Sequence, residues 1–258
     1  MKYISECSLA KITDALKAGE ITPFDILNEC CKRFKEVDYK IKSFLPETVN
    51  CEKLEKNLKA LTESVDSISD KYPFLGIPIG IKDIFHIEGY QTKAGSLLPP
   101  EILTGNESSL VTKIKNFGGL IFGKTVTTEF AYFKAGKTRN PHNIEHTPGG
   151  SSSGSAAAVA AGIVPFSIGT QTIGSIIRPA SYCGIYGFKP SQKRLPTDGI
   201  IPFSPTVDQV GFFAQDLKSI GYASAILCKD WKKEEFGFGN IKIGIPADEY
   251  LNQAKAMF

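Results

Sequence analysis

The sequence has no long apolar stretch and no leader of the secretory type. Its longest apolar run, residues 156–168, is interrupted by Gly162 and Pro165 and is shorter than the roughly 20 residues that a membrane span requires. Residues 1–6 lack the apolar core of a signal peptide. These absences predict a soluble, cytoplasmic protein without membrane partners.

Neither charge sign forms a block. The 30 lysines and arginines face 27 acidic residues, and the basic residues are scattered, which gives no support for direct binding of nucleic acid. The cysteines show neither a C-x-x-C pair nor a regular framework, so we expect reduced thiols. The six cysteines are Cys7, Cys30, Cys31, Cys51, Cys183 and Cys228.

Histidine is scarce. The three present, His86, His142 and His146, do not have the spacing of a metal site, and we expect no metal or cofactor. All three also precede the G-x-S-x-G string at 150–154, whereas an α/β-hydrolase places its catalytic histidine after a nucleophile such as Ser152. That class is therefore disfavoured.

The first seventy or so residues show helical patterns, with Leu, Ile and Phe recurring at three- and four-residue spacing. Ser8 is placed to cap the first helix, and Thr22 with Pro23 to begin the second. We expect a helical segment over residues 1–70 that packs on a core formed by 71–258. The predicted helices span 8–19, 23–38 and 51–64.

After this segment, short apolar runs bounded by glycine or proline alternate with helical stretches such as 109–117 and 155–161. This alternation predicts an α/β fold, a mixed β-sheet covered by helices. Residues 240–258 have the pattern of one more strand followed by the start of a helix. The runs expected to form strands are 76–81, 118–124, 162–170 and 184–189.

Two glycine-rich segments carry the serines best suited to nucleophilic chemistry. Residues 149–162 (GGSSSGSAAAVAAG) and 169–181 (GTQTIGSIIRPAS) each place a serine at a turn before a helix-favouring stretch. Unpaired N–H groups and the positive end of the helix dipole converge there and suit a developing oxyanion. A phosphate-binding loop is disfavoured because Gly154 is followed by Ser155 rather than lysine. Alone, the first segment fits a purely structural helix start equally well.

Lys82 closes the apolar run 76–81 and so lies at the end of a predicted buried strand, where α/β proteins usually place functional groups. Burial favours the neutral amine, which is a competent general base near neutral pH. The alternative is a structural lysine that pairs with Asp83 or a surface carboxylate.

Four motifs in consistent order resemble the amidase signature family, the serine hydrolases with a Ser, cis-Ser, Lys triad. The resemblance covers roughly residues 70 to 250, and segments 122–131, 140–143 and 205–211 agree with it. The motifs are GIPIGIKD (76–83), the two serine segments, and CGIYGFKPS (183–191).

The resemblance implies the amidase signature fold and a role for each matching residue. Lys82 corresponds to the general base, Ser151 to the bridging serine and Ser175 to the nucleophile, with a cis peptide bond between Gly150 and Ser151. Ser152 and Thr170 correspond to supporting residues. The oxyanion hole would be formed by the backbone N–H groups of Thr172, Ile173, Gly174 and Ser175.

The chain departs from the family pattern Gly-Thr-Asp-Thr-Gly-Gly-Ser-Ile-Arg at three positions. Gln171 replaces the aspartate, Ile173 the first glycine of the pair, and Ile177 the arginine. Because the acid and the base are both absent, neither charge is left without a partner. Arg178 lies one place after the missing arginine, and Ile173 requires a negative φ.

The resemblance implies an amidase that hydrolyses a small-molecule linear amide to an acid and ammonia or an amine. Two alternatives are the glutaminase subunit of a tRNA-dependent amidotransferase and an inactive or truncated binding relative. Because domains of this family continue beyond the position of Phe258, we expect the fold to lack its C-terminal part. A homodimer or a partner subunit could then cover the exposed core face.

Overall fold

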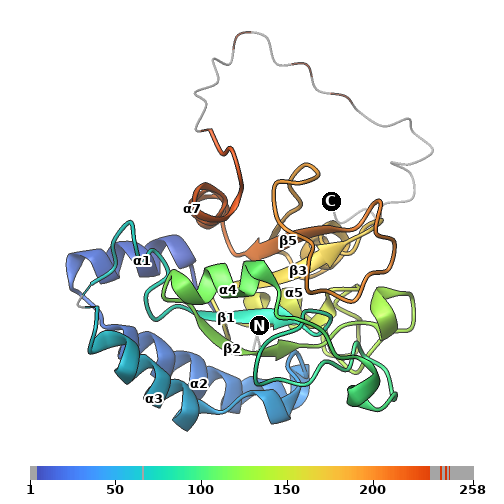
Figure 1. The fold of residues 1–258 in the computed structure, drawn as a ribbon, viewed down its shortest axis with the longest axis horizontal. Coiled ribbons are helices and arrows are strands. Elements are labelled where there is room, and N and C mark those ends of the chain that lie inside the picture. Colours follow the sequence, from blue (N-terminus) through green and yellow to red (C-terminus); the bar gives the residue numbers. More distant parts are fainter. Residues whose placement is uncertain (1–4, 66, 233–238, 240–241, 243, 245–258) are drawn as a thin grey trace.

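The computed structural model describes residues 5–65, 67–232, 239, 242 and 244. Its centre is a sheet with the strand order β2-β1-β3-β5-β4 (Figure 1). Each of the four predicted apolar runs overlaps a strand, and the mixed α/β fold is confirmed. The structure adds β5, which the sequence pattern did not predict. The strands are β1 (Pro78–Lys82), β2 (Leu120–Thr125), β3 (Phe166–Gln171), β4 (Tyr186–Phe188) and β5 (Gln209–Ala214).

The first three strands are parallel, and β5 then runs antiparallel to both β3 and β4. Register places Ile81 of β1 opposite Ile168 of β3, so Lys82 and Thr170 lie at the same edge of the sheet. The chain passes from β1 to β2 on one side and then crosses to β3 on the other. The carboxyl ends of β1 and β3 thus flank a topological switch point, the usual ligand position in α/β sheets.

Helices cover the sheet, most of them where the sequence pattern predicts a helix, although it does not predict α7. In α1 (Leu9–Ala18), Ser8 accepts the first-turn N–H of Lys11; α2 (Pro23–Ile41) begins with a capping box formed by Thr22 and Asp25. The crossover helices α4 and α5 lie on opposite faces of the sheet, as expected when the strand order reverses (Figure 1). The other helices are α3 (Cys51–Thr62), α4 (Ser109–Asn116), α5 (Ser153–Ala160), α6 (Ile177–Tyr182) and α7 (Leu217–Leu227).

Every residue of α5 is buried, although the helix consists almost entirely of Ser, Gly and Ala. These small side chains allow its backbone to approach its neighbours closely. A Cβ atom on Gly154 would lie 2.1 Å from the Ser43 carbonyl oxygen and 2.4 Å from the Val126 nitrogen. Only glycine therefore fits at this position, and the close packing fixes where the preceding Ser151 and Ser152 lie.

The expectation of six reduced thiols is wrong for one pair. Cys31 in α2 and Cys51 at the start of α3 form a disulfide, with their Cα atoms 6.1 Å apart. The packing of α2 against α3, visible in Figure 1, brings together residues that are 20 positions apart in the sequence. Spacing along the chain could not reveal that contact. The other four cysteines are free thiols.

Two further expectations concern the strand and helix near the C-terminus and the lack of a membrane-spanning segment. The strand and helix predicted within 240–258 lie outside the described residues. Among the helices that the structure describes, none is long and apolar enough to cross a bilayer.

We predict that Gly154→Ala lowers the free energy of unfolding by roughly 1–3 kcal/mol or more, because the added methyl group meets backbone atoms that cannot move aside. Urea denaturation of the variant and the parent chain measures this difference. Gly221→Ala in α7 is the matched control, since its Cβ meets nothing within 4 Å and alanine is the better helix former by about 1 kcal/mol. Equal stability of the two variants would contradict the packing argument.

Candidate active site

Lys82 is fully buried at the end of β1, as its position after the apolar run predicts. Its amine donates to the Ser151 hydroxyl at 2.8 Å and to the Thr170 hydroxyl at 2.9 Å. The alternative pairing with Asp83 does not occur, because the Asp83 carboxylate binds Lys124 instead. The structure thus brings Lys82, Ser151 and Thr170 together from three separate segments.

Burial lowers the pKa of Lys82 to about 7, since a charged amine is poorly solvated inside the protein. The negative charge of Asp208 acts in the opposite direction and raises that pKa. Near neutral pH a large fraction of the amine is therefore uncharged and able to accept a proton.

The two serines before α5 are held from different sides. The Gly150–Ser151 peptide bond is cis, the geometry that the family resemblance implies, and the Ser151 carbonyl accepts the N–H of Thr128 at 3.1 Å. The Ser152 hydroxyl donates to the Thr170 carbonyl at 3.0 Å and accepts the Thr170 N–H at 3.3 Å. Ser152 and Thr170 are thus bonded to each other, and Thr170 is bonded to Lys82.

Ser175 lies half-buried in the turn between β3 and α6 and lines the same small pocket as Ser151. The pocket has a volume of about 20 Å³, room for one water molecule. Within the described chain no hydrogen bond joins the Ser151 and Ser175 hydroxyls; catalytic contacts are often long before substrate binds. The other residues that line the pocket are Ala131, Tyr132, Phe133, Thr172, Ile173, Arg178 and Phe203.

The turn that carries Ser175 has N–H groups available to a ligand. Among described residues, the backbone N–H groups of Ile173, Gly174 and Ser175 donate to no protein acceptor. Ile173 is 72% exposed, and its φ is not positive, which is the condition that a β-branched residue needs here.

Gln171, the departure from the family aspartate, has a defined role in this turn. Its side-chain oxygen accepts the N–H groups of Ile176 at 2.8 Å and Ile177 at 2.9 Å. The amide thus binds the backbone that follows the Ser175 position without needing the lost arginine. The sequence pattern indicated only the loss of an acid at this position.

Asp208 is a second residue that sequence reasoning missed. Its buried carboxylate accepts the Thr172 hydroxyl and the N–H groups of Phe203 and Ser204. The one available signal was an acidic residue immediately before the apolar run of β5, inside the segment 205–211.

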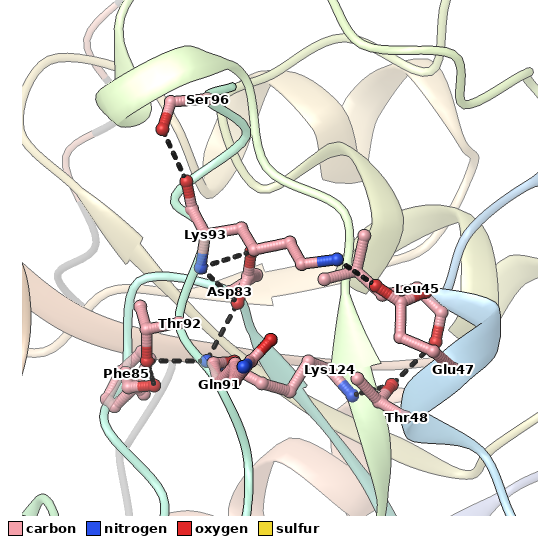
Figure 2. Close-up of polar contacts among 10 residues, drawn as sticks. All are labelled: Leu45, Glu47, Thr48, Asp83, Phe85, Gln91, Thr92, Lys93, Ser96 and Lys124. Atoms are coloured by element: carbon pink, nitrogen blue, oxygen red, sulfur yellow. Dashed lines mark hydrogen bonds and ion pairs between the residues drawn. The ribbon is translucent and has the colours of Figure 1, made fainter. Parts of the chain in front are cut away.

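A second buried lysine, Lys124, lies on the neighbouring strand β2 opposite Ile81, and Figure 2 shows its contacts. Lys124, fully buried on β2, binds the Asp83 carboxylate at 2.7 Å and donates to the Thr92 hydroxyl at 2.8 Å and the Gln91 carbonyl at 3.1 Å. Burial raises the pKa of Asp83 and lowers that of Lys124, and their mutual attraction opposes both shifts. The Asp83 carboxylate also accepts the N–H of Lys93, so the pair holds this loop against the ends of β1 and β2.

The histidines take no part in these contacts. The His142 ring lies 2.9 Å from the Cys183 carbonyl oxygen, a structural hydrogen bond. In the described ranges, no group of three His, Cys, Asp or Glu side chains is arranged to hold a metal ion.

A family model described as Amidase matches residues 25–236. The chain belongs to the amidase family. Among curated relatives, a glutamyl-tRNA(Gln) amidotransferase subunit of Endomicrobium trichonymphae is 32% identical, over an alignment that covers 95% of this chain and 55% of the relative. The corresponding subunit from Shouchella clausii is 38% identical over 221 residues, which cover 83% of this chain and 45% of that relative.

Solved structures agree with this amidase assignment. The peptide amidase of Stenotrophomonas maltophilia superposes with a TM-score of 0.77 at 28% identity and covers 87% of this chain and 48% of its own. A crystal structure of an amidase gives a TM-score of 0.76 at 32% identity, and the match covers 85% of this chain and 51% of that amidase. The predicted amidase fold is confirmed, and the chain spans about half the length of the relatives it matches.

We predict that Lys124→Met costs roughly 3–5 kcal/mol of unfolding free energy, because it leaves the Asp83 carboxylate buried without its partner. The double variant Asp83→Asn/Lys124→Met should lose less than the sum of the single losses, which a double-mutant cycle by urea denaturation measures. Lys134→Met, which breaks the exposed pair with Glu129, is the control and should cost less than about 1 kcal/mol. Additive effects at Asp83 and Lys124 would contradict a coupled pair.

Proposed function

We propose that the chain carries the catalytic residues of an amidase, which hydrolyses a small linear carboxylic amide through an acyl-enzyme on Ser175. The observation that supports this most directly is the buried Lys82 amine bonded to Ser151, beside a pocket that Ser151 shares with Ser175. A lysine without a carboxylate bonded to it, at the switch point of the sheet, suits a base better than a structural ion pair.

In the proposed acylation, the Ser175 oxygen attacks the amide carbonyl carbon. The Ser175 proton passes to Ser151, and the Ser151 proton passes to neutral Lys82. The tetrahedral intermediate then collapses, the C–N bond breaks, and the amine leaves with a proton returned from Lys82 through Ser151. Deacylation repeats these steps with water as the nucleophile, giving the acid and free Ser175.

The negative charge on the carbonyl oxygen needs donors that are already in place. The available N–H groups of Ile173, Gly174 and Ser175 support a role of the turn over residues 172–175 as oxyanion hole. Ser152 and Thr170 support the arrangement because they bind each other and Thr170 binds Lys82. This proposal involves no metal and no cofactor.

We predict that a fluorophosphonate labels the wild-type chain on Ser175 and that Ser175→Ala abolishes the labelling. Intact-mass spectrometry and peptide mapping measure it. Ser181→Ala, an exposed serine on α6, is the matched control and should be labelled like the wild type. Labelling that persists in Ser175→Ala refutes the nucleophile assignment, and a folded chain that is never labelled favours the non-catalytic alternative.

The labelling rate should also depend on pH. Since the neutral amine is the base and the pKa of Lys82 is about 7, the rate should fall about tenfold per pH unit below that value and level off above it. Stopped labelling reactions between pH 5 and 9 measure the profile. Lys82→Met should be slow at every pH, and a midpoint that survives in this variant would assign the titration to another group.

A second candidate, the glutaminase subunit of an amidotransferase complex, is favoured by the relatives named as subunits of glutamyl-tRNA(Gln) amidotransferase. Under this proposal a partner subunit covers the apolar rim of the pocket, where Ile173 is 72% and Phe133 is 64% exposed. Parallel assays with free glutamine and with an amidated peptide separate the two candidates. Preference for free glutamine over the amidated peptide selects the glutaminase subunit.

A further inference from the structure

Asp208 connects two parts of the pocket that are far apart in the sequence. The side chain, 6% exposed, precedes β5. One carboxylate oxygen accepts the Thr172 hydroxyl, and the other accepts the N–H groups of Phe203 and Ser204, both at 2.8 Å. Hydrogen bonds to a buried carboxylate are stronger than neutral ones, so these contacts restrain both segments.

Each segment forms one wall of the pocket. Thr172 begins the turn that leads to Ser175, and both residues line the pocket. Phe203 also lines it and stacks on Tyr132, with ring centroids 5.5 Å apart. Removing the carboxylate would release both walls at once.

The charge of Asp208 also reaches the proposed base. Of the charged groups near Lys82 along these elements, Asp83 follows β1 directly and binds Lys124 of β2, while α6 contributes Arg178 at the pocket. The segments that hold Ser151 and Thr170 present hydroxyl groups. Asp208 is the carboxylate whose charge raises the pKa of Lys82 against the effect of burial.

We propose that Asp208 is a positioning residue, whose carboxylate fastens the Ser175 turn to the segment that brings Phe203 to the pocket. This inference rests on the proposed function, in which Lys82 is the base and Ser175 the nucleophile. Asp208 acts through Thr172, Phe203 and Lys82, and it does not itself contact the reacting atoms.

The decisive variant is Asp208→Asn, which keeps the size of the side chain and removes its charge. Loss of two or more charge-assisted hydrogen bonds should slow fluorophosphonate labelling of Ser175 roughly 10- to 100-fold. The acid limb of the pH profile should move to lower pH, because without the nearby negative charge the Lys82 amine loses its proton more readily. A purely structural role would slow labelling without moving that limb.

Two further variants separate the positioning role of Asp208 from the effect of its charge. Thr172→Val breaks one hydrogen bond and leaves the carboxylate, so labelling should slow while the acid limb stays in place. Asp198→Asn removes a carboxylate that binds Ser109 at the start of α4 and should change neither the rate nor the limb.

The titration of Lys82 can also be measured without any labelling reaction. The Nζ resonance of Lys82 in ¹⁵N-lysine-labelled protein, assigned by its loss in Lys82→Met, gives the titration midpoint directly. A wild-type labelling rate in folded Asp208→Asn overturns the positioning role, and an unchanged midpoint there removes the effect of its charge on Lys82. If that variant does not fold, a wild-type labelling rate in Thr172→Val overturns the positioning role. A wild-type chain that is never labelled refutes the proposed function instead, while the midpoints still decide the effect of Asp208.

Discussion

The site depends on a lysine amine that is buried without a bonded carboxylate. Lys82 has lost its water shell, and its hydrogen-bond partners are the hydroxyls of Ser151 and Thr170. Because hydroxyls can both donate and accept, this environment tolerates either protonation state of the amine, whereas a bonded carboxylate would favour the charged one. The architecture around it serves to keep that environment dry and the partners in reach.

Comparison with Lys124 shows how local surroundings separate two lysines of the same sheet. Both are fully buried, and Lys124 lies opposite Ile81, next to Lys82, in the register of β1 and β2. Lys124 binds the carboxylate of Asp83 and fastens a loop, whereas Lys82 faces hydroxyl groups. Burial lowers the pKa of both amines, and at Lys124 the bonded Asp83 carboxylate opposes that shift. The same side chain is thus structural in one strand and suited to proton transfer in the next.

Close packing supplies the second constraint. The helix α5 carries side chains no larger than valine, so it can lie directly against the sheet and hold Ser151 and Ser152 over the ends of β1 and β3. A Cβ on Gly169 would approach the Ser152 oxygen to 2.7 Å, so the strand as well as the helix needs glycine where they meet. A larger side chain at Gly169 would therefore displace the polar groups beside it.

The sequence by itself determined the features that repeat locally along the chain. Helix caps at Ser8 and Thr22, the glycine-bounded strands, and a lysine at a strand end all depend on neighbouring residues, and the structure has each of them. Motif order also pointed to Ser151 and Ser175, which the fold brings to one pocket.

Tertiary structure alone decided which distant residues meet. The Cys31–Cys51 disulfide, the Asp83–Lys124 pair and the contacts of Asp208 with Thr172 all join segments that are 20 to 41 positions apart. Spacing along the chain carries no information on such contacts, because helix packing and strand order set them. The same reason explains Gln171, whose amide acquires its role only when the turn after β3 folds back over it.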